Sequence, residues 1–208
     1  MKSFWWYLAG TFWRPVCAFR ALQTDPKKLA KGLKAILLIG VLHTLTVGAL
    51  AAGGALVPAP AFLPISPDNY FFWEIFFALP VLILAWFLAA VIARLLGSRK
   101  GSGGQFRNGL SMLGFAFAVP QFPTWIIETA FAVLLNLGMT QEEFMELSAQ
   151  PGPWQTLVIG CQVLAVVWML GLTILAVGIS QKLKGGQAVA VGFLTTVLFL
   201  TIIIIFIR

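Results

Sequence analysis

The sequence predicts an all-α, polytopic membrane protein with five transmembrane helices, preceded by an amphipathic, aromatic-rich interfacial helix. Three observations support this: the composition, five long apolar runs, and the placement of the basic residues. Sixty per cent of the residues are hydrophobic and only 10% are charged, and the mean hydropathy is +0.93. Soluble domains average about 45–50% apolar and about 25% charged residues. This composition therefore favours a chain that folds in lipid.

Residues 1–24 predict an interfacial helix and not a cleaved signal peptide. Arg14 and Pro15 interrupt any continuous apolar core, and bulky aromatic residues leave no clear cleavage site. Apolar residues recur at helical spacing: Trp5, Leu8, Phe12, Val16 and Phe19. Aromatic and basic side chains together suit the headgroup boundary of a bilayer. The alternative is a helix packed against the inner face of the protein itself.

Residues 25–208 predict the membrane domain. Asp25-Pro26 is a helix-start signal before the first apolar run. The expected spans are residues 35–57, 70–96, 109–137, 154–179 and 187–207. Each is long enough, at about 1.5 Å per residue, to cross a hydrocarbon core of about 30 Å. We expect the third span to bend at Pro120 and Pro123, and residues 138–153 to form a loop.

The basic residues predict the orientation. With five spans, every Lys and Arg except Arg208 falls on the N-terminal side of the membrane. The positive-inside rule then places the N-terminus in the cytoplasm and the C-terminus outside, in a plasma or inner membrane. Because the basic residues flank apolar spans, the charge indicates topology and not nucleic-acid binding. Cys17 and Cys161 form no disulfide framework or metal motif and are expected to act as small hydrophobic residues.

A glycine-rich, basic loop lies at the centre of the chain. Gly101, Gly103 and Gly104 precede Phe106 and Arg107. A nest of backbone N–H groups for phosphate is one reading, but no P-loop Lys-Ser/Thr follows, so a flexible turn is favoured. Basic residues of this loop, Arg99, Lys100 and Arg107, are candidates for contact with anionic lipid headgroups at the cytoplasmic face.

Several of these segments resemble the Yip (YIPF) family of five-span membrane proteins, in its short prokaryotic form. The matching residues are Arg14-Pro15, Asp25-Pro26, Gly103-Gly104-Gln105-Phe106, Gly114-Phe115-Ala116, Pro120, Trp154, Gly171, Gly178 with Ser180, and Gln187-Ala188. The resemblance implies a five-helix bundle with a cytoplasmic N-terminus. Eukaryotic relatives act in vesicle traffic and bind Rab GTPases or other Yip proteins. This chain lacks their long cytosolic N-terminal region, and the resemblance carries over no catalytic residue.

Polar residues inside the spans form the candidate site. Glu128 lies well within the third span, where an ionised carboxylate costs about 2.5–3.5 kcal/mol. Gln121 shares its helical face, Gln162 of the fourth span lies at a similar depth, and His43 of the first span lies somewhat closer to the inner side. One reading is a neutral Glu128 that is hydrogen-bonded to Gln162 and serves structure alone. The other is a proton or solute relay through Glu128 and His43.

The sequence therefore favours a non-enzymatic membrane-organising or scaffold protein, with no cofactor or metal. The single histidine and the lack of a Ser/His/Asp set or HExxH motif favour no catalytic activity. A small transporter or channel that uses Glu128 is the alternative, and an unrecognised intramembrane enzyme is a third hypothesis. The expected partners are the bilayer and a second copy or another membrane protein.

Overall fold

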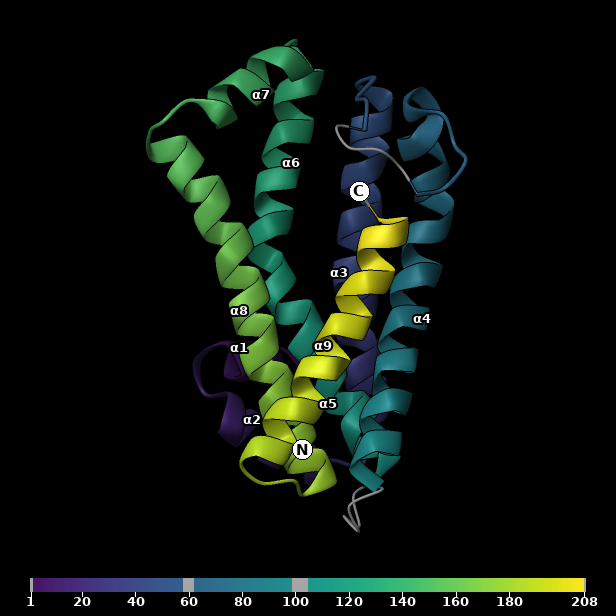
Figure 1. The fold of residues 1–208 in the computed structure, drawn as a ribbon, viewed down its shortest axis with the longest axis vertical. Helices are drawn as coiled ribbons and strands as arrows, with labels where there is room; N and C mark the ends of the chain where they lie inside the picture. Colours follow the sequence, from purple (N-terminus) through teal and green to yellow (C-terminus); the bar gives the residue numbers. More distant parts are fainter. Residues whose placement is uncertain (1, 58–61, 99–104, 208) are drawn as a thin grey trace.

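The computed structural model describes residues 2–57, 62–98 and 105–207. Five membrane-spanning segments confirm the predicted fold class (Figure 1). They are α3 (Lys28–Ala52), α4 (Tyr70–Ser98), α5 with α6 (Phe106–Ala118 and Phe122–Asn136), α8 (Pro153–Gln181) and α9 (Gly186–Phe206). Within the described residues every regular element is helical.

The third span is broken at its prolines. The 3-10 turn η2 (Val119–Gln121) separates α5 from α6, with Pro120 inside the turn and Pro123 in the first turn of α6. Proline removes a backbone donor and clashes with the preceding turn. As expected, the span changes direction at this point (Figure 1).

Small residues set how closely the spans approach. A Cβ atom added to Gly114 of α5 would lie 2.4 Å from the carbonyl oxygen of Gly32 on α3. Only glycine permits this backbone-to-backbone contact, as in other packed membrane helices. Nearby, the rings of Phe117 and Phe199 stack at 3.9 Å and join α5 to α9. The main apolar core therefore lies in the half of the bundle that contains α5.

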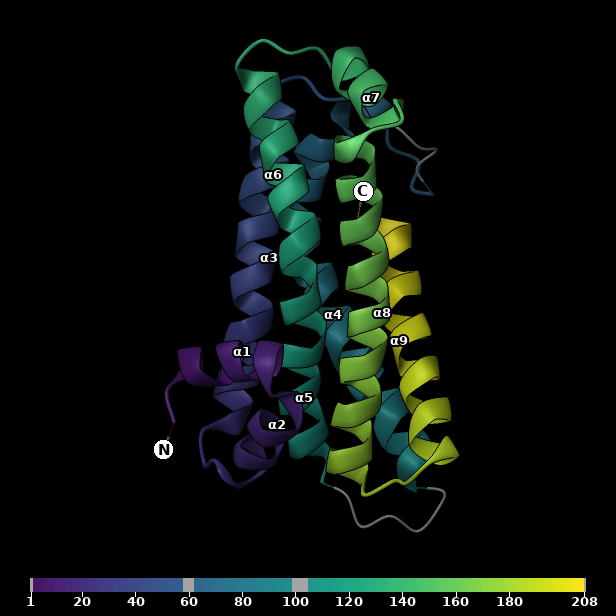
Figure 2. The same ribbon diagram turned by 90° about the vertical axis from the view of Figure 1, so that its left-hand side faces the viewer.

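Two helices, and not one, precede the first span. α1 (Phe4–Trp13) and α2 (Pro15–Thr24) meet at Arg14, because Pro15 can begin a helix but cannot continue one. Both lie across the flank of the bundle (Figure 2). Tyr7, Phe19 and Leu22 point inward and are buried, whereas Trp5 and Trp13 are 64% and 77% exposed. The segment thus packs on the protein and also presents aromatic residues outward.

Two predicted segments were wrong, the first span and the loop over residues 138–153. The helix of the first span begins at Lys28 and not at residue 35. The first span ends at Ala52 and not at residue 57, because the chain turns through Gly54 at φ +73°. Residues 138–153, predicted as a loop, contain the helix α7 (Gln141–Ala149). Its N-terminus is closed by a capping box between Thr140 and Glu143. A further 3-10 turn, η1 (Pro67–Asn69), leads into α4.

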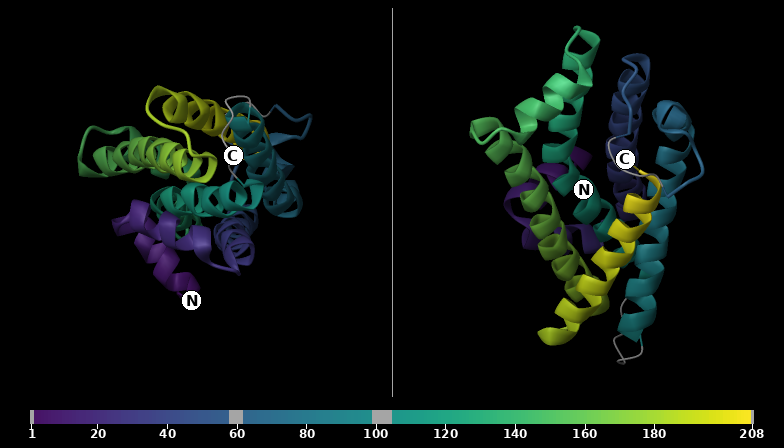
Figure 3. Two further views of the ribbon diagram at one scale, coloured as in Figure 1. Left: turned by 90° about the horizontal axis from the view of Figure 1, so that it is seen from below. Right: turned by 45° about the horizontal axis from the view of Figure 1, so that its top comes forward.

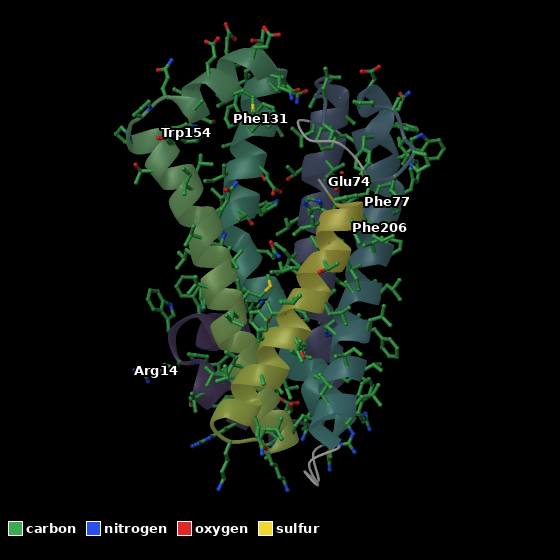
Figure 4. All side chains as sticks on the ribbon, in the orientation of Figure 1. Arg14, Glu74, Phe77, Phe131, Trp154 and Phe206 are labelled. Atoms are coloured by element: carbon green, nitrogen blue, oxygen red, sulfur yellow. The ribbon has the colours of Figure 1, made fainter. Side chains whose placement is uncertain are left out.

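The two ends of the bundle carry opposite charge. Side-chain oxygens gather at the α7 end and nitrogens at the opposite end (Figure 4). The α7 end holds Glu142, Glu143 and Glu146, whereas the turn between α8 and α9 holds Lys182 and Lys184. The folded chain thus keeps the separation of charge on which the topology prediction rests.

Candidate functional site

A cluster of three ionisable side chains lies inside the membrane-spanning bundle. The Nε2 atom of His43 on α3 lies 3.2 Å from Oε1 of Glu74 on α4. The other ring nitrogen, Nδ1, lies 3.4 Å from Oε2 of Glu128 on α6. One imidazole therefore stands between two carboxylates from two other helices. We refer to His43, Glu74 and Glu128 as the His43 cluster.

All three side chains of this cluster lie nearer the α7 end of the bundle than the opposite end. His43 lies nine residues before Ala52, the end of α3, and Glu128 lies eight before Asn136, the end of α6. At about 1.5 Å per residue both are about 12–14 Å below the α7 end of their helices. Glu74 lies one turn into α4 from that same end. The cluster thus occupies the half of the span nearest α7.

Exposure differs sharply between the two carboxylates. The Glu74 side chain is 0% exposed and that of His43 is 17% exposed, whereas Glu128 is 45% exposed. Glu128 is therefore the member of the His43 cluster that faces open space. A solute would meet Glu128 before the buried Glu74.

The arrangement of the His43 cluster can accommodate an extra proton. A neutral imidazole has one N–H donor and one acceptor nitrogen, and an ionised carboxylate only accepts. Both contacts of His43 are satisfied together only if the ring is doubly protonated or one carboxyl group carries a proton. The His43 cluster can therefore hold a proton that moves between an exposed and a buried carboxylate.

A cavity of about 170 Å³ adjoins the His43 cluster. Glu128 and His43 both line it, together with Gln121, Thr124 and Trp125. The remaining lining residues are small or aliphatic: Ile39, Gly40, Ala78, Leu82, Ile203 and Ile207. A mostly apolar pocket with a few convergent polar groups is the usual form of a small-molecule site.

A second polar layer joins α3 to α6 next to the cavity. The hydroxyl groups of Thr46 and Thr129 lie 2.9 Å apart, and the indole Nε1 of Trp125 donates to Oγ1 of Thr46 at 3.1 Å. The backbone carbonyl oxygen of Gln121 accepts a hydrogen bond from the Thr124 hydroxyl at 2.9 Å. These bonds fix the α6 residues that flank Glu128.

The structure brings together three of the four residues in the predicted polar cluster. His43, Gln121 and Glu128 line one cavity, but the predicted partnership of Glu128 with Gln162 was wrong. Gln162 is exposed on α8, which diverges from the other spans toward the α7 end (Figures 1 and 3). Equal depth along two helices therefore did not mean contact.

Glu74 is the functional candidate that the sequence reasoning missed. It follows the aromatic run Tyr70–Trp73 at the start of the second span, where an acidic residue reads as part of the headgroup boundary. The available signal was that Glu74, like Glu128, is a carboxylate inside a predicted span.

The structure describes only some of the residues that were predicted as candidates in the central loop. Gly101, Gly103 and Gly104, with Arg99 and Lys100, lie outside the described residues. Phe106 packs against Phe87 with ring centroids 6.0 Å apart. The carbonyl oxygen of Arg107 accepts from the Ser111 hydroxyl at 2.6 Å. These contacts lie at the start of α5 and do not identify a ligand.

A second buried ionic cluster anchors the N-terminal helices. Asp25 Oδ2 lies 2.6 Å from the Lys31 ammonium and accepts from the Tyr7 hydroxyl at 2.9 Å. Burial would raise the pKa of Asp25, but hydrogen bonds from Lys31, the Lys27 amide and Tyr7 outweigh it and lower that pKa. The pKa of Tyr7 is raised to about 12, mainly by burial and secondly by its hydrogen bond to Asp25. This cluster explains why α1 packs on the bundle.

Comparison with known proteins identifies no relative of this chain. No family model, no curated protein and no solved structure matches the chain. Among the residues that the structure describes, no group of three or more His, Cys, Asp or Glu side chains is arranged to hold a metal ion. The function is therefore argued from the His43 cluster and its cavity.

Proposed function

We propose that this integral membrane protein moves protons across its membrane through the His43 cluster. The observation that carries the proposal is the imidazole of His43 between an exposed and a buried carboxylate, beside a cavity. Ionisable residues inside membrane spans are costly, and they commonly mark ion pathways or proton relays.

A purely structural role explains less of this geometry. A single hydrogen bond between helices would satisfy Glu128, and such bonds average only about 0.6 kcal/mol in membranes. It requires neither a second carboxylate on the far side of the imidazole nor an opening beside Glu128. The broken third span adds support, because transporters often build their sites where a helix is interrupted.

Reconstituted vesicles with an internal pH-sensitive dye test the proposal. An imposed membrane potential should drive proton movement through the native protein, and Glu128→Gln should abolish it. The matched control is Glu142→Gln on α7, the same chemical change at an exposed residue, which should keep native flux. Absence of flux in the native protein, or flux that persists in Glu128→Gln, would contradict the proposal.

A membrane-organising or scaffold role, with no enzymatic activity, is the second candidate. The surface of α1 and α2 favours it, because Trp5 and Trp13 are exposed and so are Arg14 and Arg20. Such a surface suits a headgroup layer or another membrane protein. Replacing both tryptophans by serine would weaken this role and leave proton flux unchanged.

Family and orientation complete the proposal. A Yip-type protein with a cytoplasmic N-terminus and an external C-terminus is supported by the five spans, the broken third span and the charge separation. With that orientation the His43 cluster lies in the outer half of the bilayer.

A further inference from the structure

We propose that the cavity beside Glu128 binds a small lipophilic ammonium ion, which competes with the proton for the Glu128 carboxylate. This inference rests on the proposed function, because it names the solute that would share the proton site.

Charge favours a cation. Of the described residues that line the cavity, none is Lys or Arg, and α9 contributes no ionisable side chain. Among the residues that the structure describes, the titratable groups at the site are His43 and Glu128 in the lining and Glu74 behind His43. These three groups hold at most one positive charge and up to two negative charges. An anionic solute would meet an unfavourable site.

The apolar lining of the cavity favours a cation that carries an apolar group. Most lining residues are aliphatic, and the few polar groups are partly used within the protein. The Trp125 indole N–H is bonded to Thr46, and the Thr124 hydroxyl is bonded to Gln121. A sugar or zwitterion would leave several of its own polar groups unpaired, which is costly in an apolar site. Trp125 also offers an aromatic surface next to Glu128, a pairing that suits an organic ammonium.

Size limits the ligand to about one ring. The cavity of about 170 Å³ is close to the roughly 150 Å³ of an apolar protein cavity that holds benzene. Benzylammonium, with one ring, therefore fits, whereas tetraphenylphosphonium, with four rings, is too large.

Proton balance follows from the shared carboxylate. With one extra proton the His43 cluster carries a net charge of −1, and loss of that proton would leave −2. An arriving ammonium ion supplies one positive charge and restores the total to −1. The bound cation therefore replaces one proton, which leaves to the solvent. No covalent bond forms or breaks other than that to the proton.

Calorimetry on the purified protein in detergent tests the inference without any transport assay. We expect benzylammonium to bind, and benzyl alcohol, benzoate and tetraphenylphosphonium to bind at least tenfold more weakly. Titrations in buffers of different ionisation enthalpy should show release of up to one proton per cation. Glu128→Gln should weaken the binding of benzylammonium at least tenfold, and Glu142→Gln should leave that affinity unchanged.

The ligand series keeps the test independent of any variant that fails to fold. Equal binding of benzyl alcohol and benzylammonium, or no binding of benzylammonium to the native protein, would overturn the inference. If benzylammonium binds through Glu128 but vesicles show no proton flux, the cation site stands and the proposed function fails. If protons move but benzylammonium does not bind, the proposed function stands and the ligand class is wrong.

Discussion

At the scale of single residues, the protein has clusters of ionisable groups at two places with different surroundings. Asp25 is enclosed by donors from Tyr7, Lys27 and Lys31, so its charge is matched locally. Glu128 has His43 on one side and a cavity on the other. The first arrangement stabilises a fold, and the second leaves a carboxylate accessible.

The Asp25 cluster should make stability depend on pH at both extremes. The pKa of Asp25 is lowered in the folded state, so its contribution is present above the unfolded value of about 3.9 and is lost as pH falls below it. The pKa of Tyr7 is raised to about 12. Its contribution is complete below about 10 and is lost as pH rises from about 10 to 12.

Unfolding in detergent, followed against pH, measures both effects. Asp25→Asn should cost about 1–3 kcal/mol at pH 7, and this difference should shrink progressively as the pH falls below about 3.9. Tyr7→Phe should remove the alkaline loss. An Asp25→Asn variant as stable as the native protein at pH 7 would show that the cluster is not an anchor.

The contact between His43 and Glu74 should appear as energetic coupling. His43→Leu should destabilise the protein by about 1–3 kcal/mol, because the fully buried Glu74 loses its contact with the imidazole. The same change should cost less when Glu74 is already Leu, giving a coupling energy of about 0.5–3 kcal/mol. Unfolding by dodecyl sulfate measures the cycle. His43→Leu with Glu142→Gln is the control pair and should be additive, and zero coupling with Glu74 would contradict the contact.

At the scale of helices, close approach at Gly114 should tolerate no side chain. Gly114→Ala should cost about 1–3 kcal/mol, because its Cβ would meet the Gly32 backbone, which cannot rotate away. Gly171→Ala is the matched control, because a Cβ there meets nothing within 4 Å. That change should be neutral or stabilising by up to about 1 kcal/mol. Equal effects in the unfolding assay would place the tight α3–α5 contact elsewhere.

Local signals in the sequence predicted the helices better than the contacts between them. Apolar runs identified all five spans, and Pro120 with Pro123 identified the break, because both effects act within a few residues. The capping box at Thr140 and Glu143 is also present in the sequence, in a segment that was predicted to be a loop.

Contacts between helices were harder to predict. Gln162 was misassigned because its depth in the membrane was inferred without knowing how far α8 leans away. Glu74 was missed because pairing across helices depends on rotation of each helix about its axis.

At the scale of the whole molecule, the charge separation predicts the topology. A reporter fused after the last residue should be active only on the non-cytoplasmic side, and a fusion truncated after Lys184 should be active only in the cytoplasm. The two fusions differ by α9 alone. Activity of both on one side would mean that α9 does not cross the membrane.

The central claim is that His43 bridges two carboxylates inside the membrane bundle, and its ring nitrogens test it most directly. His43 is the only histidine in the chain, so ¹⁵N-labelled histidine gives nuclear magnetic resonance signals that need no further assignment to a residue. We expect Glu74→Gln to shift mainly the Nε2 signal and Glu128→Gln mainly the Nδ1 signal, whereas Glu142→Gln shifts neither. Ring signals that are unchanged by both Glu74→Gln and Glu128→Gln would contradict the account.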